Sequence, residues 1–317
     1  MGFKLTTYLL YLAAGLFLLY FGGEGMVRGS TALGLRLGMT PLLTGLTIVS
    51  FGTSAPELVV SLQATLSGTS GLAVGNVVGS NICNIGLILG LSVLFRPIEV
   101  EARLVRHDVP IMLACAFLLA LLLLDGVLSR FEASMLLLAL VVFIVFTIRD
   151  TRAPKRALQV EFGQALKNDH APMPIAIMLA AAGAGLLVWG GGLFVKGAVG
   201  ISETLGIAPA VIGLSVAAIG TSLPELATSV VAALRGHGDM AAGNVVGSNI
   251  FNTLSVLGIS GVVMPLNAAG VTWVDLCTLI LFSVVTLRLL WTHSAMERWE
   301  GATLVAAYLG YMAWLFR

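Results

Sequence analysis

The sequence contains an internal repeat, which becomes visible when the chain is aligned with itself at an offset of 168 residues. GTSAPEL at 52–58 aligns with GTSLPEL at 220–226, and GNVVGSNICN at 75–84 aligns with GNVVGSNIFN at 243–252. Within the 76 aligned positions that begin at Gly22, 33 are identical and no gap is needed. Two unrelated apolar segments would not keep Pro, Glu, Asn and Gly in register, so the pattern indicates a duplicated structural unit.

The composition places both copies in a membrane. Of the 317 residues, 58% are hydrophobic and 10% are charged, whereas soluble domains carry about 25% charged residues. Six runs contain no Asp, Glu, Lys or Arg: 5–23, 37–56, 58–95, 171–195, 204–224 and 240–274. A membrane-spanning helix needs about 20 such residues, so the chain is predicted to cross the membrane many times.

We expect an all-α integral membrane protein with ten transmembrane helices arranged as two inverted five-helix repeats. The expected spans are 6–35, 40–67, 71–95, 108–124, 131–148, 173–202, 207–234, 240–263, 272–291 and 300–316. Residues 1–148 would form the first repeat, 149–172 a linker and 173–317 the second repeat. Because each unit has an odd number of spans, the second copy must enter the membrane in the opposite orientation, an architecture common among secondary transporters.

The basic residues predict which side each loop faces. With ten spans, thirteen of the 17 Lys and Arg residues fall on one side, and only Lys4, Arg130, Lys196 and Arg317 fall on the other. Loops rich in Lys and Arg remain in the cytoplasm. We therefore expect a multi-pass protein of the plasma (inner) membrane with a cytoplasmic linker and both termini outside.

The first duplicated motif gathers oxygen ligands on one helical turn. Pro56 has no N–H, so the carbonyl of Gly52 loses its helical partner. Thr53 and Glu57 are four residues apart and project from one face, with Ser54 beside them. A carboxylate, two hydroxyls and loosened carbonyls are hard ligands, which suit Na⁺ or Ca²⁺.

The second motif adds neutral oxygens in the same pattern. Ser80 and Asn84 are four residues apart, and Ser248 and Asn252 repeat this spacing. Asn81 and Asn249 lie on another face of their helices, where we expect them to donate hydrogen bonds to the broken backbone. The glycines of this motif do not follow a strand and lack basic partners, which argues against a nucleotide-binding loop.

Glu57 and its repeat equivalent Glu225 are the strongest functional candidates. They are the only acidic residues in 37–95 and 204–234, where no Lys or Arg is available as a partner within the spans. A charge inside the bilayer is costly, so such residues generally serve function. Two facing carboxylates repel until a cation neutralises them, and competition between Na⁺ and Ca²⁺ for one negative site is a physical basis for antiport. Glu24, by contrast, has Arg28 four residues away and is interpreted as part of a local ion pair.

The duplicated GTS-x-PE and GN-x-x-GSN-I-x-N motifs resemble the alpha-repeat signature of the calcium/cation antiporter superfamily, in particular its prokaryotic sodium/calcium exchangers. The resemblance implies a ten-helix fold with the second, third, seventh and eighth helices at the centre and long, mobile first and sixth helices. The ligands that it implies are Thr53, Ser54, Glu57, Ser80, Asn84, Thr221, Ser222, Glu225, Ser248 and Asn252. In this family Ca²⁺ is held mainly by the two glutamates and by threonine carbonyls, with Na⁺ sites overlapping around it. Some members have Asp where Asn252 stands here, so potassium dependence is not expected and the exchange stoichiometry stays open.

The expected function is secondary active exchange of Ca²⁺ for Na⁺ by alternating access, not an enzymatic activity. Exchange of Ca²⁺ or another divalent cation for H⁺ is the alternative, because a glutamate pair can also trade a metal ion for protons. A hydrolase using Ser54 or Ser222 as nucleophile would need a base, and no His lies in these spans. A channel would not explain two complete, inverted ligand sets. We expect no cofactor and no nucleic-acid partner. The expected partners of a functional monomer are Ca²⁺, Na⁺ and the lipid bilayer, with H⁺ in place of Na⁺ in the alternative.

Overall fold

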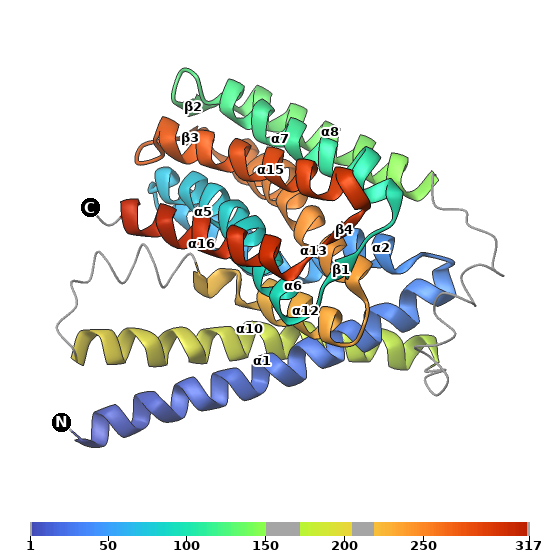
Figure 1. The fold of residues 1–317 in the computed structure, drawn as a ribbon. Helices are drawn as coiled ribbons and strands as arrows, with labels where there is room; N and C mark the ends of the chain where they lie inside the picture. Colours follow the sequence, from blue (N-terminus) through green and yellow to red (C-terminus); the bar gives the residue numbers. More distant parts are fainter. Residues whose placement is uncertain (1, 150–171, 205–218, 316–317) are drawn as a thin grey trace.

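The computed structural model describes residues 2–149, 172–204 and 219–315, and these residues are almost entirely helical (Figure 1). The longest helices are α1 (Gly2–Leu37), α10 (Met173–Thr204), α15 (Trp273–His293), α8 (Arg130–Arg149) and α16 (Arg298–Leu315). The described residues include seven helices long and apolar enough to cross a membrane, or eight if one bent pair counts as a single span. The chain is therefore an all-helical membrane protein, and the count of ten spans stays a prediction. Part of the expected span 207–234 and most of the expected linker 149–172 lie outside the described residues.

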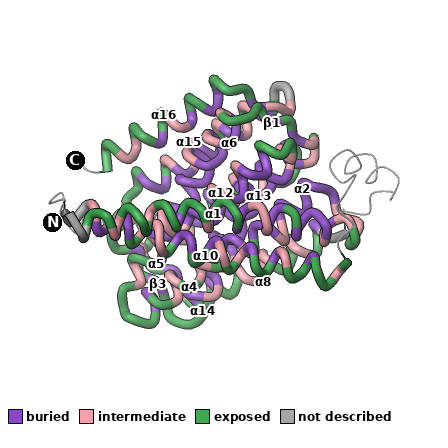
Figure 2. Tube along the Cα trace, turned by 90° about the horizontal axis from the view of Figure 1, so that it is seen from below, coloured by how far each residue is buried: buried purple, intermediate pink, exposed green. Residues whose placement is uncertain are grey.

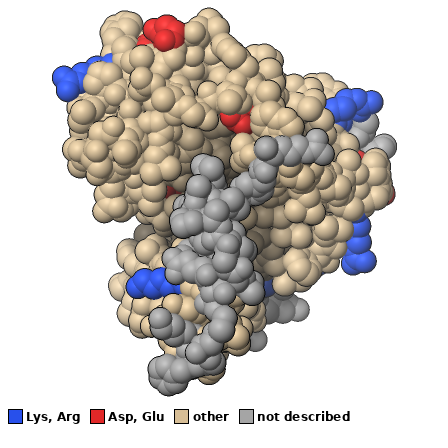
Figure 3. Space-filling view, turned by 90° about the vertical axis from the view of Figure 1, so that its left-hand side faces the viewer, with Lys and Arg blue, Asp and Glu red and all other residues tan. Residues whose placement is uncertain are grey.

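The outer surface is apolar, as a lipid-facing surface must be. Phe131 is 75% exposed and Leu138 is 65% exposed on α8, and Phe17 is 62% exposed on α1. Exposed residues follow the outward sides of α1 and α8, while buried residues gather around α12 (Leu223–Leu234) and α13 (Gly238–Phe251) (Figure 2). On the face of the molecule shown in Figure 3, charged side chains form only a few separate spots. Apolar exposure of this extent is stable in lipid and would favour aggregation in water.

Four short strands show how the two repeats are related. β1 (Ile98–Glu99) pairs antiparallel with β4 (Ala295–Met296), and β2 (Val127–Leu128) pairs antiparallel with β3 (Leu266–Asn267). The 168-residue offset makes β1 equivalent to β3 and β2 equivalent to β4, so each pair contains one strand of each repeat. The β1–β4 and β2–β3 pairs lie at opposite ends of the molecule (Figure 1). Equivalent segments therefore point in opposite directions, as expected for an inverted repeat.

Helices α1 and α10 are repeat equivalents that pack against each other in antiparallel orientation (Figure 1). A Cβ atom added to Gly15 would lie 2.9 Å from the carbonyl oxygen of Gly190, and one added to Gly22 would lie 3.0 Å from that of Gly183. The offset exchanges these two contacts, since Gly15 is equivalent to Gly183 and Gly22 to Gly190. Glycine at these positions allows the two backbones to touch, as small residues do where membrane helices cross closely.

The helices that carry the first motif are broken at the centre of the molecule. In the first repeat, α2 (Pro41–Thr44), a π-helical turn η1 (Gly45–Val49) and α3 (Ser50–Thr53) end at Ser54, where α4 (Ala55–Leu66) begins. The two parts of this span are bent by 42°. Ser222 occupies the same position before α12, and the following proline stands at the start of the helix in both copies. The expected interruption therefore lies at the serine of each GTS segment, two residues before the proline of the motif.

The second motif lies on the helices that run through the centre. They are α5 (Ser70–Cys83), η2 (Asn84–Leu89) and α6 (Gly90–Phe95), and their equivalents α13, η4 (Asn252–Val256) and α14 (Leu257–Val263). These two segments are the most enclosed candidate spans, with 78% and 89% of the apolar window buried. Both π-helical turns begin at the asparagine expected to be a ligand, and such turns occur frequently at functional sites. A further π-helical turn, η3 (Leu104–Asp108), precedes α7 (Val109–Leu122).

Candidate cation site between the repeats

Glu57 and Glu225 lie in the first turns of α4 and α12, directly after the two helix breaks. Both are completely buried. No ion pair between described residues includes either carboxylate. Two acidic groups are thus held inside the protein without a basic partner among the residues the structure describes, which is the arrangement that a mobile cation can neutralise.

The two carboxylates are joined to the opposite repeat by serine hydroxyls. Ser54 donates to Oε1 of Glu225 over 3.2 Å, and Ser222 donates to Oε1 of Glu57 over 3.4 Å. Both serines are buried. Each serine thus connects the break in its own helix to the glutamate of the other copy, so the two copies build one site together.

Six buried side-chain oxygens at this centre have no hydrogen-bond partner among the described residues. They come from three pairs of residues related by the repeat: Oε2 of Glu57 and Glu225, Oγ of Ser80 and Ser248, and Oδ1 of Asn84 and Asn252. Buried polar atoms are nearly always partnered, because an unsatisfied one costs about 1–3 kcal/mol. These six atoms are related in pairs by the repeat, and they are oxygens that a bound cation would satisfy.

The threonine hydroxyls are directed differently from the carboxylates. Thr53 donates to Oδ1 of Asn244 and Thr221 donates to Oδ1 of Asn76, each over 3.3 Å. Each threonine hydroxyl thus has an asparagine of the other repeat as an acceptor, and the hydroxyl of Thr53 also lies 3.4 Å from the main-chain oxygen of Ser50. The ligand role that the family resemblance implies for the threonines concerns their main-chain carbonyls, beside the helix breaks, and not these hydroxyls.

Asn76 and Asn244 are the residues that the sequence reasoning missed. Their amide nitrogens donate to Ser61 over 3.1 Å and to Ser229 over 2.9 Å, and all four residues are buried. Each asparagine thus links a serine of its own repeat to a threonine of the other. The signal was present in the sequence, since all four residues repeat at the same offset inside or beside the two motifs.

Asn81 and Asn249 also connect the repeats. The amide of Asn81 donates to the main-chain oxygen of Asn249 over 3.4 Å, and the amide of Asn249 donates to that of Asn81 over 3.2 Å. Their own Oδ1 atoms accept from the amides of Asn252 and Asn84 over 3.2 and 3.0 Å. The expected donation to main-chain oxygens is present, but it runs between α5 and α13 rather than within either helix.

Glu24 lies outside this cluster. Arg28 Nε is 2.7 Å from Glu24 Oε1, so the expected local pair is present. Arg235, in the turn between α12 and α13, also pairs with Glu24 and thereby ties α1 to the second repeat. This ion pair has no repeat equivalent, because Gly192 stands at the position that corresponds to Glu24.

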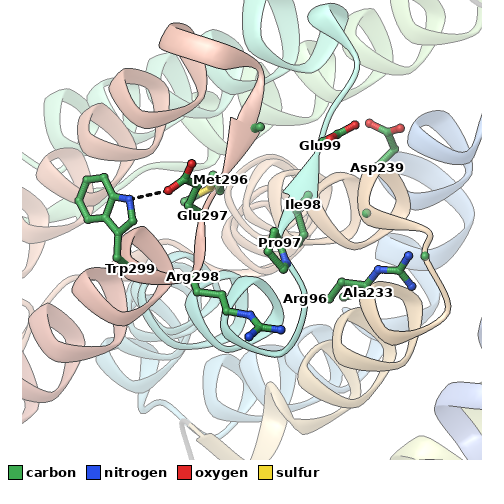
Figure 4. A pocket seen from close by; sticks show the side chains of 13 residues that line it. Arg96, Pro97, Ile98, Glu99, Ala233, Asp239, Met296, Glu297, Arg298 and Trp299 are labelled. Carbon is green, nitrogen blue, oxygen red and sulfur yellow. Dashed lines mark hydrogen bonds between the residues drawn. The ribbon is translucent and has the colours of Figure 1, made fainter.

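A separate cavity of about 950 Å³ lies at the end of the molecule where β1 pairs with β4 (Figure 4). Arg96, Glu99, Asp239, Glu297 and Arg298 are among its lining residues. None of the ten expected site residues lines it. The described residues also contain no group of three or more His, Cys, Asp or Glu that could hold a metal ion. The central cluster, with two carboxylates and otherwise neutral oxygens, is thus suited to a hard cation that enters and leaves.

The sequence matches a known family along both halves of the chain. A family model described as "sodium/calcium exchanger protein" matches residues 7–149 and 175–317. The putative antiporter CaxA of Alkalimonas amylolytica is 36% identical, over 97% of this chain and 98% of its own length. The sodium/calcium exchanger MaX1 of Methanosarcina acetivorans is 32% identical, over 98% of this chain and 99% of its own length.

A solved structure matches the fold over the same extent. The sodium–calcium exchanger NCX_Mj, soaked with Na⁺ and Sr²⁺, is 32% identical and superposes with a TM-score of 0.84. The match covers 98% of this chain and 98% of that chain. Fold and sequence therefore agree on one family.

Proposed function

The chain belongs to the sodium/calcium exchanger family, and we propose that it exchanges Ca²⁺ for Na⁺ across the membrane at the central cation site. The proposed ligands are Thr53, Ser54, Glu57, Ser80 and Asn84 from the first repeat, with Thr221, Ser222, Glu225, Ser248 and Asn252 from the second. Membership of this family supports cation antiport in general. The choice of Na⁺ as counter-ion and the assignment of individual ligands are our proposal.

The observation that carries the proposal is the set of six buried oxygens without partners. Ca²⁺ takes six to eight oxygen ligands at about 2.3–2.6 Å, including carboxylates, amide carbonyls and main-chain carbonyls. Six side-chain oxygens and the two threonine carbonyls would fill such a shell. Na⁺ is of similar size and also prefers oxygen, so smaller subsets of the same atoms can hold it.

Charge explains why the two ions would exclude each other. The two carboxylates together carry two negative charges, which one Ca²⁺ neutralises completely. With Ca²⁺ absent, these buried charges repel each other and must be compensated by Na⁺. A site that is costly to leave without a cation couples the departure of one ion to the arrival of the other, which is the requirement for exchange.

The repeat geometry supports alternating access. Glu57 follows a helix break in one copy and Glu225 follows the equivalent break in the copy that points the other way. The surroundings of the site are therefore equivalent towards the two ends of the molecule. Equivalent movements of the two copies can then open access from either side. We further propose a plasma (inner) membrane location with the 149–172 linker in the cytoplasm, on the basis of the distribution of basic residues.

Transport in reconstituted vesicles tests the exchange directly. Vesicles loaded with Na⁺ and diluted into Na⁺-free buffer should accumulate radioactive Ca²⁺, and an ionophore that dissipates the Na⁺ gradient should stop the uptake. The same vesicles loaded with choline instead of Na⁺ serve as the control. Uptake that follows an imposed pH gradient and ignores Na⁺ would overturn the sodium assignment and establish Ca²⁺/H⁺ exchange, the alternative that a glutamate pair permits.

A further inference from the structure

Four asparagines form hydrogen bonds between the segment that contains α5 and the segment that contains α13, close to where the two π-helical turns begin. Asn81 and Asn249 are 2% exposed, and Asn84 and Asn252 are completely buried. Bulk solvent therefore does not reach these amides, and the protein groups that surround each one favour a particular orientation.

The main-chain carbonyl of Asn81 determines the first orientation. A carbonyl oxygen can only accept, so the atom of Asn249 that faces it must be the amide nitrogen, which lies 3.2 Å away. This places Oδ1 of Asn249 on the other side of the same planar amide. Because Oδ1 also only accepts, it selects the amide nitrogen of Asn84 at 3.0 Å. Oδ1 of Asn84 is then the atom left without a partner among the described residues.

The second repeat contains the same series of contacts. The carbonyl of Asn249 faces the amide nitrogen of Asn81 at 3.4 Å, and Oδ1 of Asn81 accepts from the amide nitrogen of Asn252 at 3.2 Å. Oδ1 of Asn252 again has no partner among the described residues. Both series begin at an acceptor of the opposite helix and end at an oxygen of the cation site.

We propose that Asn81 and Asn249 are positioning residues of the cation site, because each orients the amide of the opposite ligand so that its oxygen, and not its NH₂ group, faces the ion. The proposal rests on the proposed function, since it assumes that Asn84 and Asn252 ligate a cation. An amide with its NH₂ group turned towards the ion would replace an attraction with a repulsion, so the orientation matters as much as the presence of asparagine.

The two series differ in one further contact. The amide of Asn81 also donates to Oγ1 of Thr253 over 3.1 Å, whereas the amide of Asn249 lies 3.5 Å from Sδ of Met112. A hydroxyl is a stronger acceptor than a thioether. Asn81 thus has one more strong acceptor than Asn249, whereas the two contacts of its series are longer, at 3.4 and 3.2 Å against 3.2 and 3.0 Å.

Double-mutant cycles test this assignment, because the contacts specify which pairs of residues must be coupled. The apparent KM for Ca²⁺ is measured in Na⁺-loaded vesicles for Asn249→Ala, Asn84→Ala and the double variant. Each single change should raise the KM by about tenfold, the effect of losing one oriented polar ligand. The double variant should be no worse than the worse single variant, because Asn249 acts through Asn84. Asn81→Ala with Asn252→Ala should behave in the same way.

The crossed pair provides the matched control. Asn81→Ala and Asn84→Ala disturb different series, so their effects on KM should multiply to about a hundredfold. Multiplication in the contacting pairs, or an unchanged KM in Asn249→Ala, would overturn the proposal. Where an alanine variant does not fold, the Asn→Gln change keeps the polarity but displaces the amide by one methylene, and the same pattern is expected. Wild-type vesicles without Na⁺-driven Ca²⁺ uptake would instead refute the proposed function itself.

Discussion

The substitution Glu57→Gln removes one of the two charges at the proposed site while preserving the size of the side chain and one oxygen. At a distance of about 2.5 Å and an effective dielectric constant of about 20, the Coulomb energy between one carboxylate and a divalent cation is about −13 kcal/mol. The same carboxylate attracts a monovalent cation by about half as much. If the amide dipole and local relaxation restore half of the loss, the variant still binds Ca²⁺ about 6 kcal/mol more weakly, or about 10⁴-fold.

The expected result is complete loss of Na⁺-driven Ca²⁺ uptake in Glu57→Gln and equally in Glu225→Gln. Both proteins should remain folded, because a neutral buried side chain avoids the desolvation penalty of a carboxylate. Initial uptake rates over a range of Ca²⁺ concentrations measure the loss, and thermal unfolding in detergent verifies the fold. Glu132→Gln is the matched control: this carboxylate accepts from Ser129 at the start of α8, away from the site, and its variant should transport normally. A folded Glu225→Gln protein with a near wild-type rate would refute the idea of one site shared by two glutamates.

Three further results are expected. In a background without native cysteines, Ala157→Cys in the predicted cytoplasmic linker should react with an impermeant thiol reagent only in inside-out vesicles; reaction in right-side-out vesicles would reverse the proposed topology. Gly22→Val should lower the yield of folded protein sharply, because its Cβ would meet the backbone of Leu187 at 2.8 Å, whereas Gly192→Val, with nothing within 4 Å of the added Cβ, should fold normally; equal yields in a detergent-extraction assay would contradict the close packing of α1 and α10. The pKa of His237, just before α13, is lowered from 6.5 by burial and by Arg235 and Arg96, so the unfolded chain binds its proton more readily than the folded one. The folded protein should therefore lose stability as the pH falls below about 6.5, and His237→Gln should reduce this loss in thermal unfolding scans; an identical pH dependence in the two proteins would contradict this role of His237.

Much of the central site could be predicted because duplication preserves polar residues in pairs. Polar residues have no reason to be in an apolar span unless they serve the site. This reasoning identifies Glu57 and Glu225, the helix breaks at the GTS segments, and Ser80 with its repeat equivalent Ser248. The structure confirms that these residues are buried, and it shows the two repeats running in opposite directions.

Contacts between the copies could not be predicted in the same way. The sequence indicates that Asn76 and Asn244 are repeated, but not that each accepts from the threonine of the other copy, because that depends on how two helices cross in space. Arg235 as a partner of Glu24 was missed for the same reason, since the two residues are far apart in the chain. The two-residue strands are too short to produce a recognisable pattern of alternating side chains.

The β1–β4 and β2–β3 pairs, each formed between the two repeats, have a consequence for the synthesis of the protein. Ile98 pairs with Met296 and Val127 pairs with Asn267, so the first half reaches the membrane while both of its strand partners are still untranslated. Three residues of its half-site also lack their partners at that stage, since Ser54 donates to Glu225, Asn84 donates to Asn249 and Glu57 accepts from Ser222. The first five expected helices can insert as soon as they leave the ribosome, but they cannot reach their final packing until β4 and then α16, which packs against α6, have been synthesised. Insertion of the first half and its folding are thus two events, separated by the time needed to translate the second half.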